Sequence, residues 1–84
     1  MAVSFAGTIK PYFTACYRAH MMMYGDQFDL WDAGQVQAEW NQIHTEVSKG
    51  AMPEAGCPEG VWDTHTRNQF LSDFQAWKDA GYPP

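Results

Sequence analysis

The chain has 84 residues, a length that forms one domain at the lower end of what a single hydrophobic core stabilises unaided. Four Trp, four Tyr, five Phe and five Met supply enough apolar side chain for a compact core, which argues against a disordered chain. The net charge of −5 and the lack of a basic stripe make nucleic acid and anionic membranes poor candidate partners.

The N-terminal residues 1–7 contain no basic region and no long apolar run. We therefore expect neither a signal peptide nor a membrane span, and a cytoplasmic protein, or a periplasmic one if the chain is a processed form. Because cytoplasmic thiols stay reduced, Cys16 and Cys57 are expected to be free thiols, with a disulfide between them as the alternative.

The first helix is predicted over residues 8–24. Thr8 is placed to cap its start, Pro11 lies in the first turn where it costs no hydrogen bond, and Gly25 can end it in the left-handed conformation. Its apolar residues recur at the i, i+3, i+4, i+7 spacing of one helix face. They are Ile9, Tyr12, Phe13, Cys16, Tyr17, His20, Met21 and Tyr24.

The second helix is predicted over residues 32–49. Asp32 can cap its start, and Gln35 can reach back in the manner of a capping box. Gly50 can end it. The apolar face is narrow, as in a helix that is packed on one side only, and consists of Val36, Trp40, Ile43 and Val47.

The third helix is predicted over residues 63–80. It starts near Asp63 or Thr64 and stops at Gly81, before the terminal prolines. Its apolar stripe consists of Phe70, Phe74 and Trp77, with Leu71 beside it. No segment alternates strongly enough to predict a strand, so residues 1–84 are expected to form one all-α domain of three main helices.

Two long ordered loops connect these helices. Residues 25–31 carry Phe28, Leu30 and Trp31, so this loop is expected to place side chains in the core, with Phe28 and Trp31 as a plug. Residues 50–62 hold three Gly and two Pro, a composition typical of an irregular, fixed loop.

Residues 16–20 read Cys-Tyr-Arg-Ala-His, one substitution from the Cys-x-x-Cys-His sequence that attaches c-type haem, and Met52-Pro53 follows in the second loop. In order and separation, these features resemble small bacterial cytochrome c domains over most of the chain. Residues 28–32 with the Met-Pro loop also resemble short proteins on this scaffold that lack a haem-attachment motif. The remaining residues that carry the first resemblance are Ile9, Phe13, Gly50, Ala51, Trp62, Phe70, Phe74, Trp77 and Gly81.

The resemblance implies a cytochrome c-like fold and, as one alternative, a bound haem c. Cys16 would then form one thioether, His20 would be the proximal iron ligand and Met52 the distal one. Ala19 departs from the motif, because it stands where the second thioether cysteine belongs. One thioether suffices to hold haem, but its attachment takes place outside the cytoplasm.

A packed, haem-free interior explains the same residues, and we expect this interior and no cofactor. Cys16 and His20 lie one helical turn apart on an apolar face, where Cys serves as a small hydrophobe. Met side chains from residues 21–23, together with Trp, can fill the volume that haem would take. The candidates for lining an internal pocket or contacting a partner are Phe28, Trp31, Trp40, Trp62 and Trp77.

Metal binding is a further alternative. Cys16 and His20 could form half of a site for Cu(I) or Zn, completed by Cys57, His65 or Met52. His44 and His65 are otherwise expected to be partly exposed residues.

The sequence does not favour an enzyme. Its carboxylates gather at loops and helix starts, where capping and the helix dipole favour them, and no phosphate-binding loop or activated nucleophile is present. We expect a small non-catalytic helical module that associates with a partner protein or with another copy of itself. The alternative is an electron-transfer cytochrome whose single-thioether haem is ligated by His20 and Met52.

Overall fold

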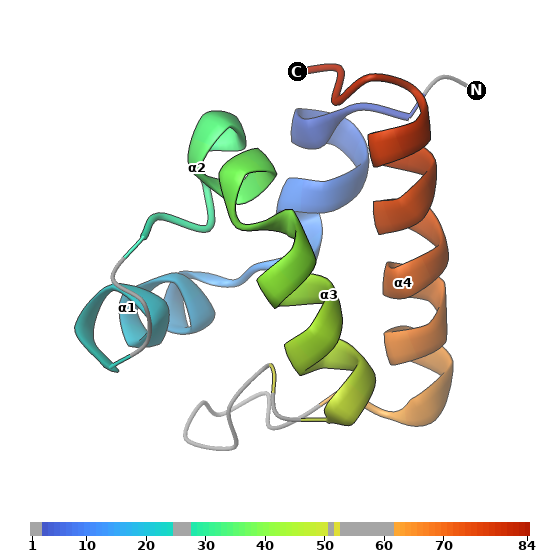
Figure 1. Ribbon diagram of the computed structural model, residues 1–84. Helices are drawn as coiled ribbons and strands as arrows, with labels where there is room; N and C mark the ends of the chain where they lie inside the picture. The colour runs from blue at the N-terminus through green and yellow to red at the C-terminus, as the bar shows by residue number, and fades with distance from the viewer. Residues whose placement is uncertain (1–2, 25–27, 51, 53–61) are drawn as a thin grey trace.

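The protein is all-α, as the sequence predicts. Its computed structural model (Figure 1) describes residues 3–24, 28–50, 52 and 62–84, except for the side chain of Tyr24, and no strand occurs among them. Gly25, Cys57 and most of the predicted loop 50–62 therefore lie outside the described residues. The elements are two short helical turns, η1 (Phe5–Ile9) and η2 (Lys10–Tyr12), and four α-helices, α1 (Ala15–Tyr24), α2 (Ala33–Ala38), α3 (Trp40–Lys49) and α4 (Thr64–Asp79).

The single helix predicted over residues 8–24 is wrong, because helical structure begins earlier and is interrupted. Ser4 caps η1, a π-helical turn, by accepting a hydrogen bond from the Gly7 N–H. Thr8 does not cap a helix; its hydroxyl accepts from the Ser4 N–H. The chain then becomes extended at Phe13, and the Thr14 hydroxyl accepts from the backbone N–H three residues on, which starts α1.

The helix predicted over residues 32–49 is divided into α2 and α3 at Glu39, whose ψ of 15° is not helical. Asp32 caps α2 as expected, but the Gln35 side chain accepts from the Asp29 N–H instead of returning to Asp32. The division falls next to Trp40, whose indole N–H donates to the Phe74 carbonyl of α4 at 3.1 Å. The break at Glu39 thus lies next to a hydrogen bond between Trp40 and α4. The spacing of apolar residues in the sequence does not indicate this break.

The third predicted helix agrees closely with α4. Asp63 caps its start by accepting from the Thr66 N–H at 2.7 Å. At its end, Gly81 has a φ of 88°, and the N–H groups of Gly81 and Tyr82 donate to the carbonyls of Lys78 and Trp77. This is a Schellman motif, and the Tyr82 ring completes it by packing 5.0 Å from the Trp77 ring.

The two ends of the described chain are joined at the Pro83 carbonyl. It accepts hydrogen bonds from the Phe5 N–H at 2.9 Å and from the Trp77 indole N–H at 2.8 Å. Phe5 also packs its ring 5.5 Å from that of Trp77. The N-terminal turn is therefore fixed to the end of α4, and Figure 1 shows the two segments side by side.

The main core lies where η1, α3 and α4 meet. Phe70, Phe74 and Trp77 of α4 are completely buried, and their rings follow one another at 4.8 and 5.8 Å. The Tyr12 hydroxyl donates to Asp73 at 2.7 Å and connects η2 to the same helix. Burial, and after it this hydrogen bond, raises the pKa of Tyr12. The remaining buried residues are Phe5, Ile9, Phe13, Tyr17, Phe28, Leu30, Val36, Trp40, Ile43 and Val47.

Helix α1 lies on the other side of the molecule from α4, with α3 between them in the view of Figure 1. The segment after it is fixed by Arg18, which donates two hydrogen bonds to Asp29 at 2.7 and 3.0 Å. Asp29 also accepts from the Trp31 N–H at 2.9 Å. Phe28 and Leu30 are 7% and 1% exposed, so the predicted insertion into the core is confirmed for these two residues. Trp31, the other half of the predicted plug, is only half-buried.

Among the described helices, none combines the length and apolar character needed to cross a lipid bilayer.

Candidate functional site

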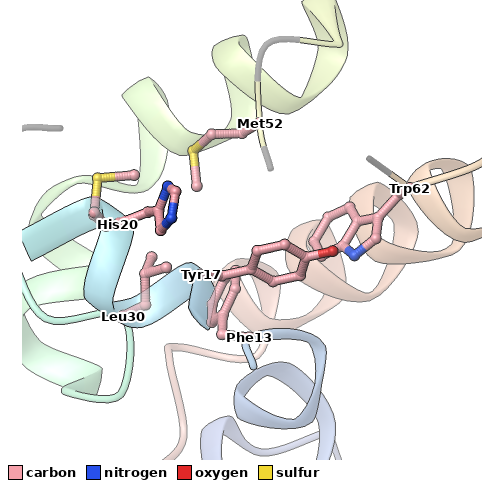
Figure 2. A pocket seen from close by; sticks show the side chains of 7 residues that line it. Phe13, Tyr17, His20, Leu30, Met52 and Trp62 are labelled. Carbon is pink, nitrogen blue, oxygen red and sulfur yellow. The ribbon is translucent and has the colours of Figure 1, made fainter. Parts of the chain in front are cut away.

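A small pocket lies between α1 and Met52, which comes shortly after the end of α3 (Figure 2). It brings together two of the three predicted haem-site residues, His20 and Met52. Figure 2 shows the Met52 side chain extending toward the His20 imidazole, with Leu30 and the aromatic rings along the rest of the wall. The lining residues are Phe13, Tyr17, His20, Met21, Leu30, Met52 and Trp62.

Local backbone structure explains how Met52 reaches the pocket. Gly50 ends α3 with a φ of 81°, a left-handed conformation that glycine adopts readily. The turn reverses the chain, and the Met52 N–H donates to the Glu46 carbonyl at 3.3 Å, which holds Met52 against the last turn of α3. A Cβ atom at Gly50 would also lie 3.2 Å from the Arg67 guanidinium. Both the left-handed backbone and this close approach therefore favour glycine at position 50.

Aromatic rings form the part of the pocket nearest the main core. The Trp62 ring lies 4.9 Å from Phe70, 6.2 Å from Tyr17 and 6.5 Å from Phe13. Of the five aromatic residues that the sequence suggests for a pocket or partner contact, Trp62 is the one that lines it.

The other four of these residues lie elsewhere. Trp77 and Phe28 are buried in the core, and Trp40 is buried with its ring 5.1 Å from Phe74. Trp31 is half-buried on the α1 side, where its indole N–H donates to the Phe13 carbonyl at 2.8 Å. Two cations lie over the Trp31 ring, Arg18 at 4.6 Å and Lys10 at 5.3 Å.

The pocket does not fit a haem. Its cavity volume is about 20 Å³, enough for one water molecule, whereas sites for organic ligands enclose roughly 300–1,000 Å³. Leu30 and Tyr17 take up space next to His20, and Trp62 lies beyond Tyr17 (Figure 2). His20 and Met52 are thus brought together, as the cytochrome resemblance implies, but without the volume that the cofactor requires.

Cys16 is not a free thiol, contrary to the expectation from the sequence. It is disulfide-bonded, and the other half of the bond lies outside the described residues. It is also half-buried, on the same helix as His20 and one turn before it. A sulfur in a disulfide cannot form a thioether to a haem vinyl, so the structure presents Cys16 in a form that does not support the haem interpretation.

The other histidines and the consecutive Met residues of α1 differ in exposure. His44 is half-buried against Trp40, at 4.8 Å between rings, and His65 is exposed. Met21 lines the pocket, but Met22 and Met23 are 46% and 64% exposed. The expectation that all three consecutive Met side chains fill the interior is therefore wrong for Met22 and Met23.

The exposed Met side chains belong to a continuous apolar face of α1. Ala15, Ala19, Met22 and Met23 are all exposed and follow one another at helical spacing. We call these four residues the α1 face. No Asp or Glu occurs in α1, although the chain contains ten acidic residues. The acidic protein thus presents one apolar surface on a helix without negative side chains.

The strongest electrostatic feature near the site is the ion pair of Arg18 and Asp29. The Arg18 guanidinium, followed by the Trp31 N–H, lowers the pKa of Asp29 to about 2. Sequence reasoning missed this pair, because residues 11 apart in different elements show no regular spacing. The described residues contain no group of three or more His, Cys, Asp or Glu side chains that could hold a metal ion.

Tyr17 and Leu30 line the pocket, but the sequence analysis did not assign them to a site. Tyr17 belongs to the apolar stripe predicted around Cys16, and Leu30 to the loop predicted to enter the core, but neither pattern indicates a pocket.

Comparison with protein-family models, curated proteins and solved structures found no match.

Proposed function

We propose that the chain is a small, haem-free helical module without catalytic activity, which acts by protein association through the α1 face. The observation that supports this proposal most strongly is the exposure of Met22 and Met23, at 46% and 64%, next to Ala15 and Ala19. Unbranched Met side chains adapt to different partner surfaces, and the two Ala residues allow a second helix to approach closely.

The charge distribution favours a second copy of the chain as the partner. With a net charge of −5, two copies repel each other over most orientations. Because α1 contains no Asp or Glu, contact between two α1 faces places no α1 carboxylate of one copy near the other copy. Arg18, which flanks the face, is neutralised by its ion pair with Asp29. Self-association through this face therefore buries apolar surface with the least electrostatic cost.

The face is small, and we expect weak association. Stable complexes bury about 800 Å² on each partner, more than four side chains of one short helix provide. The equilibrium should therefore depend on protein concentration and shift toward the monomer on dilution.

Sedimentation velocity over a range of concentrations tests the proposal. Met22→Lys with Met23→Lys should abolish the concentration-dependent increase in sedimentation coefficient, because each copy would bring two charges into the contact. Gln69→Lys with Ser72→Lys is the matched control, since both residues are exposed on α4 and the change in net charge is the same. Equal association by both variants, or a wild-type protein that stays monomeric throughout, would contradict self-association through the α1 face.

An electron-transfer cytochrome is the alternative function, favoured by the presence of His20 and Met52 in one pocket. The cavity volume and the disulfide-bonded Cys16 speak against it. Visible absorption and intact mass separate the two functions. A Soret band and a haem mass addition, both lost in Cys16→Ala, would replace the haem-free proposal with the cytochrome.

A further inference from the structure

The pocket combines a soft set of potential ligands with a very small volume. One imidazole, from His20, and the side chains of Met21 and Met52 line it together. We propose that this pocket binds a single Cu(I) ion through His20 and the thioether sulfurs of Met21 and Met52. Thioethers and imidazole suit Cu(I), whereas Mg²⁺, Ca²⁺ and Mn²⁺ require oxygen ligands.

The rest of the lining favours a singly charged ion. Phe13, Tyr17, Leu30 and Trp62 are the pocket's other described lining residues, and none of the described lining residues carries a carboxylate. The solvation free energy lost when an ion enters apolar surroundings rises with the square of its charge, so a dication with neutral ligands is penalised far more than a monocation. Zinc sites normally include thiolate, carboxylate or several imidazole ligands. The described part of the lining offers one imidazole and none of the others.

The cavity volume agrees with one ion and with nothing larger. About 20 Å³ accommodates a single water-sized sphere. The same volume that is too small for haem is therefore suited to an ion held directly by side chains.

The backbone fixes two of the three ligands relative to each other. His20 and Met21 are consecutive in α1, and Met52 is attached to the end of α3 by its N–H bond to Glu46. One imidazole nitrogen of His20 would bind the ion. The other would remain for a hydrogen bond, as is normal for a metal-bound His. Binding would join α1 to α3, two helices far apart in sequence.

Anaerobic titration with Cu(I) in competition with a chromophoric chelator tests the proposal. The protein should carry its disulfide intact, verified by mass, because a free Cys16 thiol would itself bind Cu(I). We expect one equivalent bound by the wild type, and a loss of affinity of at least about tenfold in His20→Gln, Met21→Leu and Met52→Leu, as for damage to other metal sites. Met→Leu conserves volume, so these variants should remain folded by circular dichroism.

Met23→Leu is the matched control, because it removes a thioether that is 64% exposed and outside the pocket. It should bind Cu(I) like the wild type. A second readout uses Ag(I) as a redox-inert probe, which should shift the Met21 and Met52 methyl resonances and leave that of Met23 unchanged. Absence of binding, unchanged affinity in Met52→Leu, an equal loss in Met23→Leu, or equally tight binding of Zn²⁺ would each overturn the proposal.

Discussion

The aromatic core around α4 and the α1 side of the molecule are built differently. In the core, Phe70, Phe74 and Trp77 are completely buried, and the Pro83 carbonyl joins both chain ends to them. On the α1 side, an ion pair, a half-buried Trp31 and a disulfide at Cys16 hold the helix, and its outer face is apolar and exposed. The difference indicates that burial stabilises the core, whereas the α1 side carries the exposed apolar face on which the proposed self-association depends.

Truncation of one Trp in each region tests this comparison most strongly. Trp77→Ala should lower the free energy of unfolding by about 3–5 kcal/mol, because it leaves a large cavity and removes the indole bond to Pro83. Trp31→Ala should cost clearly less, since the Trp31 ring is half-buried and leaves a smaller cavity, even though its indole hydrogen bond and two cation–π contacts are also lost. Urea unfolding followed by circular dichroism measures both. Equal losses would show that the two regions contribute alike.

Reduction of the disulfide should give the next largest effect. Among the described side chains of α1, Tyr17 is the one that is buried. We therefore expect the crosslink at Cys16 to contribute to holding α1, and a reducing agent should lower the free energy of unfolding by about 2–4 kcal/mol. Urea unfolding with and without the reductant measures the loss. If reduction left the unfolding midpoint unchanged, the bond at Cys16 would contribute nothing to holding α1.

The ion pair on the α1 side should produce a smaller, pH-dependent effect. The pKa of Asp29 is about 2 in the folded protein and about 3.9 in an unfolded chain. Because the pKa of Asp29 is lower in the folded state, the ionised carboxylate contributes its full stabilisation above about pH 4. This contribution is lost as the pH falls through about 2 and Asp29 becomes protonated in the folded protein. The difference in unfolding free energy between wild type and Asp29→Asn should therefore shrink over this interval.

Arg18→Gln provides the corresponding control for Asp29. In that background, Asp29→Asn should have a much weaker pH dependence, because the guanidinium is the first cause of the lowered pKa. An unchanged pH dependence in the double variant would assign the effect to another group.

The sequence predicted the all-α fold and one helix almost to the residue. Asp63 and Gly81 mark the ends of α4 through side-chain capping and a left-handed backbone, both of which are local signals. The divisions within the other two predicted helices involve the extended residue Phe13 and the non-helical Glu39. There, the apolar spacing continues through the break, so the sequence pattern alone could not reveal it.

The candidate site was predictable only in part. His20 and Met52 could be selected because a motif and a family resemblance pointed to them, and the structure places both in one pocket. The volume of that pocket depends on how Tyr17, Leu30 and Trp62 pack, which no spacing encodes. Likewise, the exposure of Met22 and Met23 depends on which side of α1 faces the rest of the protein.

Amide hydrogen exchange, resolved by residue and measured at low and high protein concentration, tests the division between core and binding side most directly. We predict that the amides of α4 around Phe74 exchange slowest at both concentrations, and that α1 exchanges faster but gains protection at the higher concentration. Protection of α1 equal to that of α4 in the dilute protein, or a concentration effect confined to α4, would contradict this account.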